Sequence, residues 1–306
     1  DSYDPTENIA SPAHIYGMDG EITKWDKSKD EKYIYAGMRR GGKGFYALDV
    51  SNISSPRLLW KISNSGDFAE MGQTWSRAVK TQIKVGNTIK HVLIFGGGYD
   101  PAQDNHTTRQ ADNKGRTVYI VDAQTGQLIW SASNQNYAAM KYSIPSDVKV
   151  IDLDNDKLAD QIYVGDMGGQ VWRFDIDNSG KNTKQLIKGG VIANIAGTTS
   201  SSNRRFYHAP DISIMRENGK RMLAVAIGSG YRAHPNDSVI NDRFYMFKQE
   251  ISEPDYKTIT EKTLYDVTSN IIGTGSAQRV ETERGKLASA DGWLLDFTRR
   301  GEKVLA

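Results

Sequence analysis

Four aspartates between residues 152 and 160 have the spacing of a calcium-binding loop. The segment reads Asp-Leu-Asp-Asn-Asp-Lys-Leu-Ala-Asp, which puts carboxylates at loop positions one, three, five and nine. Calcium takes about six to eight oxygen ligands, and short loops supply them from these positions and from a carbonyl at position seven. The sequence therefore predicts a Ca2+ site with the ligands Asp152, Asp154, Asp156, the Leu158 carbonyl and Asp160.

Two positions of this loop depart from the usual pattern. Lys157 stands at position six, where glycine is usual, and a left-handed conformation there costs on the order of 1 kcal/mol. Tyr163 stands at position twelve in place of a bidentate glutamate, so Asp160 is assigned that role. The alternative is a solvated turn whose carboxylates cap backbone amides. Without a cation, however, clustered carboxylates repel one another.

The segments around the loop read as β-strands. Apolar residues at 148–151 precede it and residues 161–164 follow it, so the setting is strand, loop, strand instead of the helices of an EF-hand. A glycine-ended strand followed by an aromatic strand recurs along the chain. The copies are residues 32–37, 44–50 and 58–62; residues 91–96, 116–122 and 127–130; residues 161–165 and 170–175; and residues 222–228 and 242–247.

Repetition of a strand set at a period of roughly 40 to 60 residues is typical of stacked propeller blades. The predicted fold class is therefore all-β, a β-propeller with about four to five blades or part-blades in this chain. Residues 1–306 are predicted to form a single β-propeller domain or a fragment of one. Residues 292–297 and 302–306 are expected to start another blade, so that the chain ends before the ring closes. A sandwich of unrelated hairpins is the alternative.

Several expectations concern the remaining segments. The polar stretches 99–114 and 197–205 are predicted to be long surface loops. The only segment expected to hold a short helix is 255–269. Trp60, Trp130 and Trp172 recur near strand ends, where indole rings are expected to pack between blades with their N–H groups bonded to backbone.

The composition excludes several classes of function. The 39 basic and 37 acidic residues give a net charge of +2, which provides no strong field for nucleic acid, so no nucleic-acid partner is expected. The chain has no cysteine and no paired histidine spacing, which leaves no recognisable catalytic constellation, and it is predicted not to be an enzyme. No apolar run reaches the roughly 18 residues that a membrane span requires. Any export signal is expected upstream of residue 1.

Three segments together resemble a known family. Residues 41–49, residues 150–160 and the run Gly-Asp-Met-Gly-Gly-Gln-Val-Trp-Arg-Phe at 165–174 are similar to the C-terminal domain of the PilC and PilY type IV pilus biogenesis factors and tip adhesins. The resemblance covers essentially the whole chain. It implies a modified seven-bladed, quinoprotein-like propeller with one calcium site. By motif position, the family's metal ligands fall on the aspartates at 152, 154, 156 and 160.

The resemblance also implies a function and a location. In that family, calcium occupancy is tied to pilus extension and retraction, so the domain would act as a regulatory and adhesive module. Its expected partners are pilin or minor pilins, and a host-cell receptor would be bound through other domains. The expected location is the bacterial cell surface, the pilus tip or the outer membrane, after export.

Two other functions remain open. Residues 121–130, Val-Asp-Ala-Gln-Thr-Gly-Gln-Leu-Ile-Trp, are similar to the tryptophan-docking blades of pyrroloquinoline-quinone dehydrogenases. Those enzymes commonly carry vicinal cysteines, which this chain lacks. An integrin-like or lectin-like calcium propeller is the other alternative, although such proteins usually repeat the calcium loop in several blades.

Overall fold

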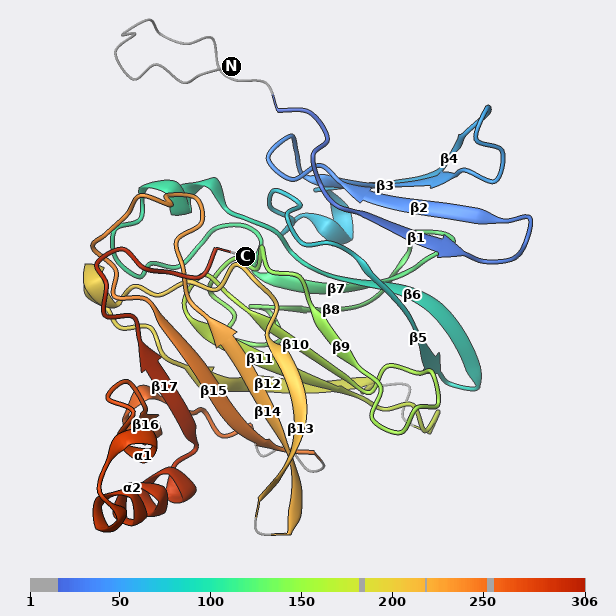
Figure 1. Ribbon diagram of the computed structural model, residues 1–306. Coiled ribbons are helices and arrows are strands. Elements are labelled where there is room, and N and C mark those ends of the chain that lie inside the picture. Colours follow the sequence, from blue (N-terminus) through green and yellow to red (C-terminus); the bar gives the residue numbers. More distant parts are fainter. Residues whose placement is uncertain (1–15, 182–184, 218, 252–255, 306) are drawn as a thin grey trace, which may run out of the picture.

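Four β-sheets stand side by side as an open fan in the computed structural model, which describes residues 16–181, 185–217, 219–251 and 256–305 (Figure 1). Each sheet is called a blade here and is numbered in chain order. Blade 1 holds β1 (Ile22–Asp26), β2 (Lys32–Gly37), β3 (Gly44–Asp49) and β4 (Arg57–Ser63). Blade 2 holds β5 (Val79–Val85), β6 (Thr88–Gly96), β7 (Thr117–Asp122) and β8 (Leu128–Ser133).

Blades 3 and 4 follow the same antiparallel plan. Blade 3 holds β9 (Lys149–Ile151), β10 (Gln161–Gly165), β11 (Gln170–Ile176) and β12 (Ile187–Asn194). Blade 4 holds β13 (Asp211–Glu217), β14 (Lys220–Gly228), β15 (Arg243–Glu250) and β17 (Gly292–Asp296), with the short β16 (Tyr265–Asp266) parallel to β17. The 3-10 turns are η1 (Gly66–Phe68), η2 (Pro101–Asn105), η3 (Ser200–Ser202) and η4 (Glu261–Thr263). The predicted all-β propeller is confirmed, with four blades in the described residues.

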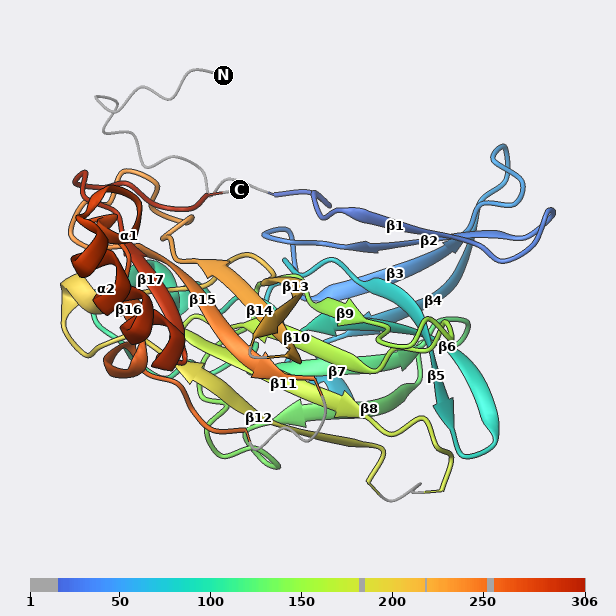
Figure 2. The ribbon, with the colours of Figure 1, turned by 60° about the horizontal axis from the view of Figure 1, so that its bottom comes forward.

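The inner strands are buried on both faces because successive side chains point to opposite sides of a sheet. In β6, Val92 and Ile94 enter a core shared with blade 3, while Leu93 and Phe95 enter a core shared with blade 1. In β10, Tyr163 likewise packs toward blade 4. Three inter-blade cores result, and Figure 2 shows the blades layered against one another.

The recurring tryptophans stabilise the contacts between blades. The Trp60 indole N–H donates to the Ala123 carbonyl of the next blade at 3.1 Å. Its ring lies against Gly126, where a Cβ atom would come within 2.8 Å of the ring. Trp172 is buried as well, but its N–H donates to the Asp166 carboxylate. Trp130 is half-buried and contacts Phe174 edge-on at 5.4 Å.

Two expectations about the C-terminal part are wrong. The segments 292–297 and 302–306 do not start another blade, because β17 pairs antiparallel with β15 and completes blade 4, and residues 302–305 form no strand. The expected helix at 255–269 is also misplaced, since the described part of that stretch holds only η4 and β16. The helices are α1 (Ile271–Thr274) and α2 (Ala277–Ser289), both inserted between β16 and β17. Helix α2 is rich in alanine, glutamate and arginine, which favour helix, but it buries no residue fully and lacks a clear apolar stripe.

No helix in the described part of the chain has both the length and the apolarity needed to cross a bilayer.

A matched pair of substitutions tests the inter-blade cores. Ile94 is fully buried in the core between blades 2 and 3, whereas Ile214 on β13 is 55% exposed. Ile94→Ala should lower the free energy of unfolding by about 2–5 kcal/mol, because it leaves a cavity that the neighbouring blade cannot fill. Ile214→Ala should cost about 1 kcal/mol or less. Urea unfolding compares the two, and similar losses would contradict the double-faced packing.

Candidate metal centre

The predicted calcium loop, residues 152–160, is called the acidic loop and joins β9 to β10. It lies at the end of blade 3 beside the β5–β6 hairpin of blade 2 (Figures 1 and 2). Two backbone hydrogen bonds hold its last residues: Ala159 N–H donates to the Gln82 carbonyl at 2.8 Å, and Asp160 N–H donates to the Ile151 carbonyl at 2.8 Å. The acidic loop is therefore fixed to two blades at once.

Three of the four predicted carboxylates come together. Asp152, Asp154 and Asp156 are exposed, and one oxygen from each lies within 4.8 Å of the others. None of the three forms an ion pair with a lysine or arginine in the described residues. Three unneutralised carboxylates at this distance repel one another, and their hard oxygen atoms are the donor type that calcium prefers.

The same carboxylates also cap the turns of the acidic loop. Asp152 accepts from the N–H groups of Asn155 and Lys157, at 2.7 and 2.9 Å. The Oδ1 atoms of Asp154 and Asp156 accept from N–H groups two residues ahead, at 3.1 and 2.7 Å. The capping alternative is thus realised in the structure. It does not exclude cation binding, because a carboxylate oxygen that accepts one N–H group keeps a further lone pair for a cation.

Lys157 adopts the left-handed conformation expected for position six, with φ +75°, and Asn155 does so with φ +64°. Asparagine tolerates this region through its short polar side chain, whereas lysine gains no such compensation. Lys157 therefore introduces local strain, as the sequence indicated.

Asp160 is not one of the three carboxylates that lie within 4.8 Å of one another, and its oxygen atoms accept hydrogen bonds at the base of the acidic loop. Its Oδ2 accepts from Leu153 N–H at 2.7 Å, and its Oδ1 accepts from the Asn178 side-chain amide at 3.3 Å. Burial raises the pKa of Asp160, and the nearby charges of Asp154 and Asp156 add to this rise. The Leu158 side chain is buried beneath the loop.

Asn178 is a residue of this site that the sequence did not single out. Its side-chain amide also donates to the Ala159 carbonyl at 2.9 Å, and its oxygen accepts from Lys84 N–H at 2.9 Å. It thus joins the β11–β12 turn, the acidic loop and β5. The turn sequence Asp-Asn-Ser-Gly at 177–180 is visible in the chain, but its contact with a loop 18 residues earlier is not.

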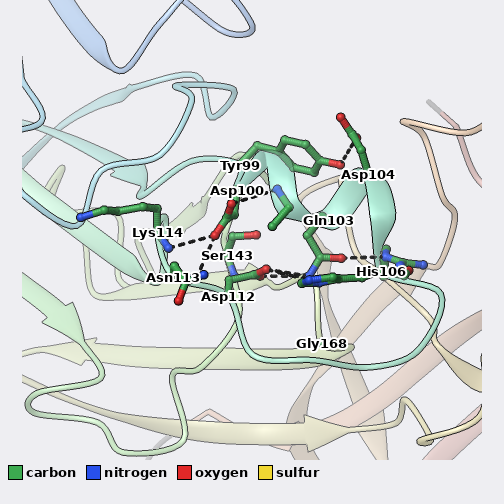
Figure 3. Close-up of polar contacts among 12 residues, drawn as sticks. Tyr99, Asp100, Gln103, Asp104, His106, Asp112, Asn113, Lys114, Ser143 and Gly168 are labelled. Carbon is green, nitrogen blue, oxygen red and sulfur yellow. Dashed lines mark hydrogen bonds and ion pairs between the residues drawn. The ribbon is translucent and has the colours of Figure 1, made fainter.

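A second polar cluster lies in the segment 99–114, which the sequence indicated as a surface loop (Figure 3). That expectation is wrong for its interior, because Asp100, Gln103 and Asp112 are buried. The Gln103 amide donates to both oxygens of Asp112 at 2.9 and 3.0 Å, and Ser143 N–H donates to the same carboxylate at 2.7 Å. Burial raises the pKa of Asp112.

Contacts with other blades explain why this polar segment is buried. Asp100 accepts from the N–H groups of Asn113 and Lys114, which closes the loop on itself. Arg205 then donates from Nε to the Gln103 oxygen at 3.0 Å. Arg205 is itself buried, so the predicted surface loop at 197–205 is also partly interior.

Asp166 organises the turn within the Gly-Asp-Met-Gly-Gly run. The carboxylate is fully buried and accepts from the N–H groups of Gly168 and Gln170 and from the Trp172 indole, each at 2.9 Å. Burial nevertheless dominates and raises the pKa of Asp166 to about 7. The run is therefore a structural turn that fixes a core tryptophan.

Several known proteins are similar to this chain. A family model described as the PilY1 beta-propeller domain matches residues 9–243. The type IV pilus biogenesis factor PilY1 of Pseudomonas aeruginosa (strain UCBPP-PA14) is 28% identical over 173 residues, which are 56% of this chain and 14% of that protein. A PilY1 homolog of Xylella fastidiosa is 24% identical in an alignment 305 residues long that covers 95% of this chain and 22% of the homolog.

A solved structure has the same fold. The crystal structure of the Pseudomonas aeruginosa PilY1 C-terminal domain superposes with a TM-score of 0.62 at 19% sequence identity, and the match covers 90% of this chain and 62% of that one. The chain therefore spans less than a quarter of the two curated relatives and under two thirds of the solved domain.

Substitutions at Lys157 test the strain in the acidic loop. Lys157→Gly should keep or raise the free energy of unfolding in calcium-free buffer, by up to about 1 kcal/mol, because glycine adopts positive φ freely. Lys157→Ile should lower it by about 1 kcal/mol or more, since β-branched side chains strongly disfavour that region. Urea unfolding with a chelator measures both, and the opposite order would contradict the left-handed conformation.

Asp166 should give the stability of the protein a defined pH dependence. Its pKa rises from an ordinary 3.8 in the unfolded chain to about 7 in the fold. The folded state then binds the proton more tightly, so this group's contribution is present below about pH 4 and is lost as the pH rises toward 7. In Asp166→Asn the free energy of unfolding should fall less steeply over that range. Urea unfolding at several pH values tests this, and equal slopes would refute it.

Proposed function

Because the chain belongs to the PilY1 β-propeller domain family, we propose that it is a calcium-binding, non-enzymatic module of a type IV pilus biogenesis factor. Relatives in two organisms carry the biogenesis-factor name. The observation that supports calcium binding is the cluster of Asp152, Asp154 and Asp156. Their carboxylates lie close together, and no lysine or arginine of the described residues forms an ion pair with them.

The proposed ligands are the five that the spacing of the acidic loop suggests. Asp152, Asp154 and Asp156 supply the clustered carboxylates, and the Leu158 carbonyl and Asp160 complete the set. Bound calcium would supply positive charge that offsets the repulsion among the carboxylates. The residues themselves hold the site in place, because backbone amides orient three of the carboxylates and Asn178 ties the fourth to its neighbours.

The position of the acidic loop suggests how such a site would regulate. The loop projects from the edge of blade 3 and is joined to blade 2 directly through Gln82 and indirectly through Asn178, which bonds both Ala159 and Lys84. Calcium that favours one loop arrangement would shift the population of that arrangement, and with it a surface available to a partner. We propose that this partner is pilin or a minor pilin at the cell surface, and that occupancy affects pilus extension, retraction and adhesion.

Calorimetric titration tests calcium binding directly. The wild-type chain, freed of metal by a chelator, should bind calcium and show a higher unfolding midpoint when calcium is present. At a hundredfold excess over the dissociation constant, the gain in the free energy of unfolding is about 2.7 kcal/mol. Asp154→Ala should abolish both effects, because it removes a ligand, and it costs the turn only the hydrogen bond from Asp156 N–H at 3.1 Å.

Asp67→Ala is the matched control, since Asp67 is exposed and lies outside the acidic loop. It should bind calcium as the wild type does. Unchanged calcium affinity in Asp154→Ala would sink the ligand assignment. Quinone absorbance or dye reduction with alcohols would instead favour the dehydrogenase alternative, and calcium-dependent binding to a glycan array would favour the lectin-like one.

A further inference from the structure

A pocket rich in arginine lies at the opposite end of blade 2 from the acidic loop. Trp75 precedes β5, whereas the acidic loop contacts Gln82 in the middle of that strand, and Asn178 beside the loop contacts Lys84 near the strand's end. The loops after β2, before β5, after β6 and after β14 meet here (Figure 1). They enclose about 490 Å³. We call this space the arginine pocket, and its polar lining includes Arg39, Arg40, Arg232, Asp104 and His234.

Two neighbouring arginines lie against a single indole ring. The guanidinium carbons of Arg39 and Arg40 are 4.8 and 5.3 Å from the centre of the Trp75 ring. Arg40 also lies 5.9 Å from the ring centre of Tyr99. Ring contacts hold a guanidinium group through its face, so the N–H donors around its edge stay available. The two side chains are therefore prearranged without using up their hydrogen bonds.

The backbone is distorted in a way that brings these two side chains together. Successive side chains of an extended strand point to opposite faces, so adjacent arginines would not normally reach one ring. Arg39 instead has φ +51°, and its N–H donates to the Thr74 carbonyl at 3.1 Å. Met38 N–H is fixed to the Thr74 hydroxyl at 2.8 Å. A left-handed non-glycine residue that its surroundings hold in place is a common feature of binding sites.

The acidic neighbours leave much of this positive charge unpaired. Arg40 meets Asp104 through one contact of 3.4 Å, and Arg39 meets Asp19 through one of 3.8 Å. By contrast, Arg243 of blade 4 contacts two carboxylates at 2.7 and 2.9 Å. Arg232 is exposed and has no hydrogen bond or ion pair within the described residues. Arg39 and Arg40 thus each meet one carboxylate through a single long contact, and Arg232 forms no ion pair although it lines a cleft together with Asp147.

The floor of the arginine pocket is rigid. The Trp75 indole N–H donates to the Gln73 side chain at 3.3 Å, and its ring packs at 5.0 Å from Tyr99 and 6.1 Å from Tyr207. Tyr99 and Tyr207 are buried in a core cluster. A ligand would therefore meet donors on a fixed platform, which limits the entropy lost on binding.

We propose that the arginine pocket binds a carboxylate side chain of an acidic peptide segment. The planar fork of a guanidinium group matches a carboxylate through paired N–H···O bonds. A peptide fits better than an isolated acid because a second cleft of about 890 Å³ adjoins the pocket, and Asp104 and His234 line both. That cleft offers hydroxyl and apolar side chains, such as Thr107 and Val239, to the rest of an extended chain.

The test uses two fluorescent, end-blocked peptides, one of alternating glutamate and serine and one with glutamine in place of glutamate. Fluorescence anisotropy should show that the wild-type chain binds the glutamate peptide at least about tenfold more tightly than the glutamine peptide. Raising the salt concentration should weaken the binding. Equal affinity for the two peptides would overturn the proposal.

Variants then locate the binding. Arg232→Gln and Arg40→Gln should each weaken the glutamate peptide about tenfold, and Arg40→Lys should recover only part of the loss, because lysine lacks the planar fork. Arg221→Gln is the matched control, since Arg221 is exposed on β14 outside the pocket, and it should bind normally. Arg232 forms no hydrogen bond or ion pair within the described residues, so unchanged binding by a folded Arg232→Gln would refute the site.

Two further measurements test whether the bound carboxylate belongs to a peptide, and whether peptide binding is independent of the acidic loop. Glutarate should displace the fluorescent peptide only at a much higher concentration than the unlabelled glutamate peptide does. Equal potency of the two competitors would overturn the assignment to a peptide. Binding should persist in Asp154→Ala, which separates this site from the calcium loop. Loss of peptide binding in that variant would overturn the independence of the two sites.

Discussion

The packing of alternate side chains onto two neighbouring blades is the interaction on which the rest of this molecule depends. Val92 and Leu93 are adjacent in the chain, yet they belong to different inter-blade cores. No blade buries its own faces, so each is ordered only by its neighbours. The acidic loop and the arginine pocket therefore have defined geometries because both are built on loops whose strands are fixed by this packing.

The sequence was most informative where strands are buried on both faces. Residues 91–96 and 116–122 read as strands because they are continuous apolar runs, and they form the interior strands β6 and β7. Strands β5 and β13 alternate polar with apolar residues and are partly exposed, so their composition resembles that of loops. Helix α2 was missed for a related reason, since it has helix-forming residues but little apolar face to mark it.

Local spacing predicted the cluster of three carboxylates in the proposed metal site and could not predict the remaining contacts. The alternation of Asp152, Asp154 and Asp156 brings their carboxylates together in one turn, as the pattern indicated. Asn178 belongs to another hairpin, and nothing near it in the chain reveals its bond to Asp160. The arginine pocket was missed for the same reason. Nothing near Arg39 and Arg40 in the chain reveals that both lie against Trp75, which is 35 or more residues away.

Strand β17 of blade 4 is far from its partner β15 in the sequence, and this affects the order in which the chain folds. Blades 1 to 3 are each made from strands that follow one another closely, so each can close soon after it leaves the ribosome. In blade 4, one side of β15 remains an unpaired edge until Gly292–Asp296 has been made, after both helices. A bare strand edge is a template for pairing with other chains. The nascent protein is therefore most exposed to misassembly just before its last described strand is synthesised.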